Sequence, residues 1–186
     1  GIEIGDLATR ERSAELRKSL GIPETAKVVA TASEMMELEE TACLLQAFEQ
    51  VVIKKPNTRL LIFGHGPKFK EIERAMLDLA LGSKVILTGK IKDQDLPDYI
   101  ALADVLVNLS SRTTGFEPSL LEAMAQKKPI VGSEVSPMGK IVEHGIDGFL
   151  VRPADVRELT ALLVDIFNHQ LPIEAIEIGR ASCRER

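Results

Sequence analysis

The chain has 186 residues, of which 45% are hydrophobic and 27% charged, and its formal net charge is −5 at pH 7. This length is enough for one domain with a sizeable core. The negative charge argues against a nucleic-acid partner, because no basic face offsets it. No apolar run approaches the roughly 20 residues that are needed to cross a bilayer. Two cysteines do not make a disulfide framework, and Cys43, on an apolar helical stripe, is expected to be a buried, reduced thiol.

Short apolar segments alternate with amphipathic segments along the chain. Apolar and β-branched runs predict strands over 27–32, 59–63, 84–87, 105–109, 130–133 and 149–151. Helical spacing of apolar residues predicts helices over 39–52, 69–81 (ended by Gly82), 96–103, 119–126, 139–144 and 155–169. This alternation predicts an α/β domain with a parallel sheet and helices on both faces. Ligands bind such sheets at the carboxyl ends of strands, near the point where the strand order reverses.

The most informative segment is 114–125, which follows the predicted strand 105–109 and a polar loop over 110–113. A strand that passes through a small-residue loop into a helix creates an anion site, because free backbone N–H groups and the helix dipole point to one place. Glu122 lies about one turn into this helix, too deep for a simple cap. It is either a solvated glutamate favoured by the dipole or an acceptor for ligand hydroxyls. A phosphate beside a polyol indicates a nucleotide sugar.

The same segment resembles the signature of glycosyltransferase family 4 (glycosyl transferases group 1), with a Ser-Ser loop, Gly-Phe and Leu-Leu-Glu-Ala-Met-Ala after a strand. Further segments are similar to the family's strands and glycine turns, in the same order: 60–67 with its Gly-x-Gly-Pro turn, 85–90, 129–132 and 141–151. The resemblance extends over nearly the whole chain. It implies a Rossmann-like fold, the C-terminal half of a GT-B enzyme.

The resemblance also implies a function. Enzymes of this family transfer a sugar, with retention of configuration, from a nucleotide-diphosphate sugar such as a UDP-, GDP- or ADP-sugar. The glycan or lipid-linked acceptor would be bound by an N-terminal domain outside this chain, so the chain alone is expected to bind nucleotide without catalysing hexosyl transfer. No metal or other cofactor is expected, and the implied location is cytoplasmic, with attachment to the inner face of the membrane left open.

Site residues follow from the matched motifs. The catalytic positions are Glu122, the expected ribose ligand, and Thr114, which stands where the family has a glutamate that contacts the donor sugar. A threonine can hydrogen-bond a sugar but cannot stabilise positive charge, and Glu117 either substitutes for that glutamate or caps the helix. The diphosphate is expected on the helix end and the base near 89–91. The full set of donor-binding residues is Gly64, His65, Gly66, Gly89, Lys90, Ile91, Gly115, Phe116, Glu117, Ser119, Leu120, Leu121 and Glu122.

Two acidic residues depart from the family pattern. Glu34 and Glu39 stand where the family commonly has an Arg and a Lys aimed at the diphosphate. Each like-charge pair would cost on the order of 4 kcal/mol at about 4 Å. Either this loop is shifted, so that Lys140 or Lys90 supplies charge, or the donor is held otherwise, or the domain no longer transfers sugar. The alternatives are therefore a non-catalytic partner-binding or regulatory domain, and a nucleotide-sugar epimerase of GT-B fold.

Both ends of the chain are expected to be cut. The start, Gly1-Ile2-Glu3, resembles the Gly-Val-Asp that follows the interdomain linker in the family. Residues 177–186 resemble a translated sequencing adapter. The expected donor-binding domain is therefore 1–176, truncated at both ends.

Overall fold

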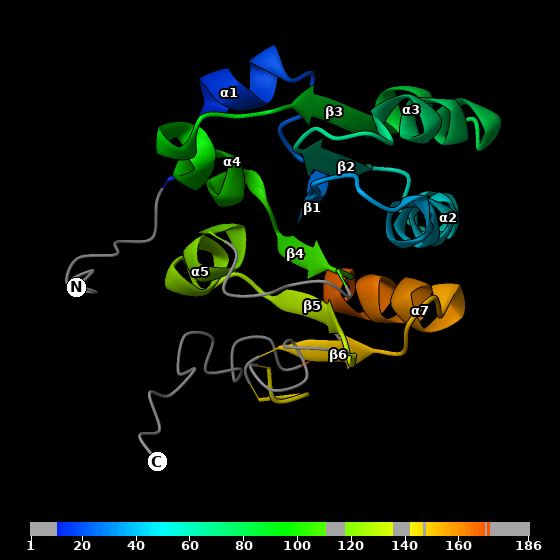
Figure 1. Cartoon of the computed structure of the whole chain (residues 1–186). Coiled ribbons are helices and arrows are strands. Elements are labelled where there is room, and N and C mark those ends of the chain that lie inside the picture. Colours follow the sequence, from blue (N-terminus) through cyan, green and yellow to red (C-terminus); the bar gives the residue numbers. More distant parts are fainter. Residues whose placement is uncertain (1–10, 111–117, 136–141, 147, 170, 172–186) are drawn as a thin grey trace.

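A parallel sheet organises the part of the chain that the structure describes. The computed structural model describes residues 11–110, 118–135, 142–146, 148–169 and 171. Its strands are β1 (Lys27–Ala32), β2 (Thr58–Phe63), β3 (Val85–Gly89), β4 (Val105–Asn108), β5 (Ile130–Ser133) and β6 (Phe149–Val151). Within the described ranges, they pair in the order β3-β2-β1-β4-β5-β6, and every pairing is parallel (Figure 1). The strand order therefore reverses between β1 and β4.

Helices cover both faces of the sheet, as the sequence predicts (Figure 1). The helices on one face are α2 (Leu38–Lys54), α3 (Phe69–Asp78) and α7 (Val156–Phe167). Those on the other face are α1 (Ala14–Ser19), α4 (Leu96–Leu102) and α5 (Pro118–Ala125). The short 3-10 helices η1 (Gly82–Lys84) and η2 (Asp93–Asp95) flank β3. Within the described part of the chain, no helix is both long enough and apolar enough to cross a membrane.

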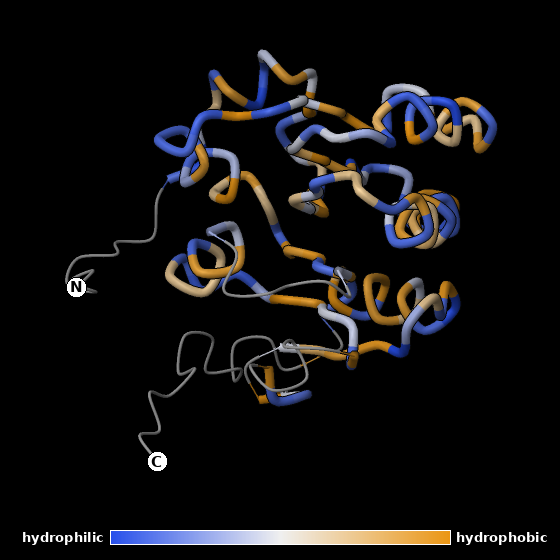
Figure 2. Tube along the Cα trace, in the orientation of Figure 1, coloured by the Kyte–Doolittle hydropathy of each residue, from blue (hydrophilic) through white to orange (hydrophobic). Residues whose placement is uncertain are grey.

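Alternate strand residues fill two separate cores. In β1, Val29 belongs to the core beneath α2 and α7, whereas Val28 and Ala30 belong to the core beneath α4 and α5. Because both faces are buried, the strands are almost continuously apolar. Figure 2 shows this pattern, with mostly hydrophobic strands and helices that mix hydrophobic and hydrophilic residues. Cys43 on α2 is 8% exposed and has a free thiol, as predicted, and burial raises the pKa of that thiol.

The pairing between β1 and β4 is short. β1 pairs with β2 along its whole length, but with β4 only at Val29↔Val105 and Ala30↔Leu106. The last two residues of each of these two strands therefore lie beyond their shared ladder. The central strands are least bonded to each other at the carboxyl edge of the sheet.

Lys128 caps the carboxyl end of α4. Lys128 donates from Nζ to the carbonyl oxygens of Ala101 at 3.0 Å and Ala103 at 2.9 Å. These carbonyls lie at the carboxyl end of α4, where a cation is favourable. Burial of the ammonium group, together with nearby Arg12, lowers the pKa of Lys128 to about 8.

The end of α3 differs from the prediction that Gly82 stops this helix. The helix ends at Asp78, and Ala80 adopts φ 51° in the left-handed region. The amide of Leu81 then donates back to the carbonyl of Met76 at 3.1 Å, which is the closing bond of a Schellman motif. Leu81 is only 4% exposed, so burial of its side chain offsets the strain at Ala80.

Two other differences concern helices. α1 was not predicted, and it begins at Ser13, whose side chain accepts a hydrogen bond from the amide of Leu16 at 3.1 Å. Of the helix predicted over 139–144, residues 139–141 lie outside the described ranges. Residues 142–144 are not helical, so that part of the prediction was wrong. The remaining predicted strands and helices agree to within about two residues.

Candidate functional site

A pocket lies where the strand order reverses. It is bounded by the end of β1, the loop over 33–37, the start of α2, and the end of β4 with Leu109 and Ser110. Thr31 and Asn108 reach it from the carboxyl ends of β1 and β4, although they are only 6% and 4% exposed. The Asn108 side-chain oxygen accepts a hydrogen bond from the amide of Ser110 at 3.0 Å. Sequence reasoning missed both residues. The signal was a polar side chain near the end of each of two apolar strands.

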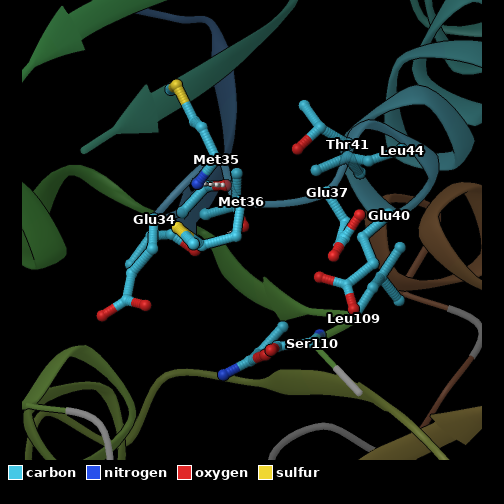
Figure 3. A pocket seen from close by; sticks show the side chains of 13 residues that line it. Glu34, Met35, Met36, Glu37, Glu40, Thr41, Leu44, Leu109 and Ser110 are labelled. Carbon is cyan, nitrogen blue, oxygen red and sulfur yellow. Dashed lines mark hydrogen bonds between the residues drawn. The ribbon is translucent and has the colours of Figure 1, made fainter. Parts of the chain in front are cut away.

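Three carboxylates line this pocket: those of Glu34, Glu37 and Glu40. Figure 3 shows Glu37 and Glu40 on one side of the pocket and Glu34 on the other. Of the two acids predicted here, Glu34 is present, whereas Glu39 is exposed on α2 and is not part of the lining. Helical geometry turns its neighbour Glu40 toward the pocket instead. The place of Glu39 beside the diphosphate stays a prediction. Among the described residues that line the pocket there is no Lys, Arg or His.

The acidic loop over 33–37 is held at several points. The amide of Ser33 donates to the carbonyl of Phe63 at 3.0 Å, and the Ser33 hydroxyl accepts from the amide of Met35 at 3.1 Å. The Met35 carbonyl accepts from the amide of Lys68 at 3.0 Å. Met35 itself has φ 50° and is 1% exposed, so its side chain anchors the loop in the core beneath α2. These contacts leave the carboxylate of Glu34 at the pocket.

The glycines of the Gly-x-Gly-Pro turn face this loop. A Cβ on Gly64 would lie 1.9 Å from the carbonyl oxygen of Ser33, and a Cβ on Gly66 would lie 1.8 Å from that of Glu34. Gly64 also has φ 132°, and its amide donates to the carbonyl of Gly89 at 2.9 Å. Both glycines therefore permit close approach of the loop over 33–37. Their role as donor-binding residues stays a prediction.

The other predicted donor-binding residues on the first half of the chain lie in the adjoining loops. His65 is exposed, and its ring stacks at 5.0 Å, tilted by 39°, on that of Phe69. Gly89 has φ 71° with open space where a Cβ would be, so conformation alone favours glycine there. Lys90 is exposed, whereas Ile91 is half-buried against the core beneath α4.

The first two turns of α5 carry the remaining described site residues. Ser119 and Leu120 are buried, whereas Leu121 is 43% exposed. Glu122 is half-buried, and its Oε1 accepts a hydrogen bond of 2.6 Å from Nε2 of Gln126. Sequence reasoning did not identify Gln126. The i, i+4 spacing with Glu122 was the available signal.

Several predicted residues lie outside the described ranges: Thr114, Gly115, Phe116, Glu117 and Lys140. Their roles stay predictions. Within the described ranges, no group of three or more His, Cys, Asp or Glu side chains could hold a metal ion.

Comparison with known proteins identifies relatives of this domain. The family model described as "Glycosyl transferases group 1" matches residues 26–169. The N-acetyl-alpha-D-glucosaminyl L-malate synthase of Bacillus anthracis is 29% identical over 141 residues, which cover 76% of this chain and 36% of that protein. The chain spans less than half the length of the curated relatives it matches.

Solved structures share the fold. Alr3699/HepE of Anabaena, in complex with UDP-glucose, superposes with a TM-score of 0.78 at 24% identity, covering 95% of this chain and 50% of that one. The C-terminal domain of a glycosyl transferase group 1 family protein (LpcC) from Francisella tularensis superposes with a TM-score of 0.76 at 20% identity, covering 96% of this chain and 94% of that one. The chain thus belongs to the glycosyl transferases group 1 family and has the fold of the C-terminal domain of a GT-B glycosyltransferase.

Proposed function

We propose that this chain is the donor-binding half of a retaining glycosyltransferase that uses a nucleoside-diphosphate sugar. The observation that carries the proposal is the position of Glu122 and the pocket. Both belong to loops and helices that begin at the carboxyl edge of the sheet, around the point where the strand order reverses. Membership of the family and the Anabaena structure with UDP-glucose support it.

In this proposal the ribose, the diphosphate and the base each bind a different part of the carboxyl edge of the sheet. The ribose hydroxyls donate to Glu122, because a carboxylate offers two acceptor oxygens to a vicinal diol. The diphosphate lies at the amino end of α5, where the helix dipole favours an anion. The base lies near 89–91. Binding needs no metal ion.

The acidic loop over 33–37 restricts how the diphosphate is held. Its hydrogen bonds to Phe63 and Lys68 argue against a shift that would move Glu34 away. The diphosphate is therefore held from the α5 side, and the carboxylates of the pocket face the transferred sugar, whose hydroxyls are suitable donors. An N-terminal half binds the glycan or lipid-linked acceptor, so the chain alone binds donor without transferring a hexosyl group.

The acidic lining also favours a second candidate function. Three carboxylates without a described cation in the lining disfavour any polyphosphate. A domain that has lost donor binding would keep the fold and act as a partner-binding or regulatory domain.

Titration calorimetry with UDP, GDP and ADP, in EDTA, distinguishes the two. The proposal predicts binding of one nucleotide, weakened roughly ten- to a hundredfold by Glu122→Ala, which removes a charged hydrogen-bond acceptor. Glu15→Ala, an exposed substitution of the same type on α1, is the control and should bind normally. A folded wild-type chain that binds none of the three would overturn the proposal and favour the second candidate.

A further inference from the structure

Gln126 links α5 to α4 at the proposed ribose site. It follows the last residue of α5, and its side chain is almost wholly buried, at 3% exposed. Nε2 lies 2.6 Å from Oε1 of Glu122 and 2.9 Å from the carbonyl oxygen of Pro97. Pro97 belongs to the first turn of α4, the helix that follows the loop over 89–95. One amide group therefore connects the carboxylate to the helix next to the proposed base site.

The chemistry of the partners fixes the orientation of this amide. A carboxylate and a backbone carbonyl are both acceptors, so only the NH₂ group can face them, with one hydrogen for each. The amide oxygen is buried without a hydrogen-bond partner among the described residues. A leucine or methionine would fill the space without leaving a polar atom unpaired. The donor pair is therefore the reason for a glutamine at this position.

The hydrogen bond from Gln126 holds one of the two oxygens of the Glu122 carboxylate. Oε1 is occupied by a short, charge-assisted bond, which restricts rotation of the side chain. Among the described residues, Oε2 has no hydrogen-bond partner. The carboxylate is thus held in a set direction, and both Oε2 and the second lone pair of Oε1 remain able to accept hydrogen bonds from a ligand.

We propose that Gln126 is a positioning residue that orients Glu122 for recognition of the ribose hydroxyls, and so sets discrimination between ribonucleotides and nucleotides that lack these two hydroxyls. This inference rests on the proposed function. Without Gln126 the carboxylate would rotate freely and lose affinity for the hydroxyls, whereas contacts to the base and the diphosphate would be unchanged.

The test is the ratio of dissociation constants for UDP and 2′,3′-dideoxy-UDP, which lacks both hydroxyls, or for the corresponding GDP or ADP pair, measured by calorimetry. Gln126→Met preserves side-chain length and removes the donor. Gln126→Glu keeps the shape and places a second carboxylate against Glu122. Wild type should prefer the ribonucleotide about tenfold or more. Both variants should bring the ratio close to that of Glu122→Ala while leaving affinity for the dideoxynucleotide within about twofold.

The possible results test the proposed function and the role of Gln126 separately. If wild type binds no nucleotide, the proposed function fails, and this inference fails with it. If wild type discriminates and Gln126→Met keeps the same ratio, only the inference is overturned. Equal weakening of both nucleotides by Gln126→Met would also overturn it, since that pattern indicates a purely structural role. Thermal unfolding of each variant confirms that the chains compared are folded.

Discussion

Replacing Gly66 with alanine would disturb the acidic loop over 33–37 without touching a charge. A Cβ at this position would lie 1.8 Å from the carbonyl oxygen of Glu34 and 2.8 Å from its carbonyl carbon. Both distances are below the 3.0 Å at which the contacts of real Cβ atoms begin, and the distance to the oxygen is far below it. The obstacle is backbone rather than a flexible side chain. The loop must therefore move away from the turn that contains Gly66.

The cost of this movement can be worked out from the contacts that hold the loop. It breaks two backbone hydrogen bonds of 3.0 Å, from Ser33 to Phe63 and from Lys68 to Met35, each contributing about 1 kcal/mol. It also loosens the packing of Met35, which is 1% exposed and whose burial contributes about 1.5–3 kcal/mol. The free energy of unfolding should fall by about 3–5 kcal/mol, a large fraction of the usual total.

Urea unfolding followed by circular dichroism measures this loss. Gly21→Ala is the matched control, because Gly21 has φ 66° and nothing within 4 Å of its Cβ position. That substitution introduces only backbone strain, about 1–2 kcal/mol. A Gly66→Ala chain that loses no more stability than Gly21→Ala would refute the reasoning that close approach of the loop requires this glycine.

Two further predictions concern charge. The pKa of Lys128 is about 8 in the folded chain against 10.5 ordinarily, so between these pH values the unfolded chain binds more protons. The free energy of unfolding should therefore rise with pH across that window. The two pKa values set an upper limit of about 3 kcal/mol, and solvent screening of the half-buried side chain reduces the rise below that limit. In Lys128→Met, the free energy of unfolding measured with urea should not rise between pH 7.5 and pH 10. A rise equal to that of the wild type would contradict this prediction. Glu34→Gln removes a negative charge from the pocket, so affinity for the bound nucleoside diphosphate should increase roughly two- to fivefold at low salt and less at high salt. Calorimetry at two ionic strengths checks this against Glu15→Gln, and unchanged affinity would mean that the diphosphate lies far from Glu34.

The strands could be predicted from the sequence because both faces of each are buried. A residue such as Val28 or Val29 must be apolar whichever core it enters, so the run is continuous and easily recognised. Helix ends were harder to predict. Ala80 adopts a conformation that glycine usually provides, and it does so because Leu81 gains burial, which depends on the tertiary structure.

The sequence could predict where the pocket lies, but not all of the residues that line it. The order of strands and loops locates it, and Glu34 follows directly from its position after β1. The inward turn of Glu40 in place of Glu39 depends on how α2 is rotated about its axis, which a motif does not specify. Gln126 was missed because its importance comes from the carbonyl of Pro97, which lies 29 residues away in sequence.

The short ladder between β1 and β4 divides the sheet into two mechanical units. β3, β2 and β1 are one unit, and β4, β5 and β6 are the other, joined at Val29↔Val105 and Ala30↔Leu106. Across this line, α2 packs against α7 on one face. A tensile load applied across the strands would therefore part the domain along this line first. The amide of Ala32 faces the β4 side beyond the shared ladder, so its proton should exchange with solvent sooner than that of Ala30, which lies deeper on the same side of the strand.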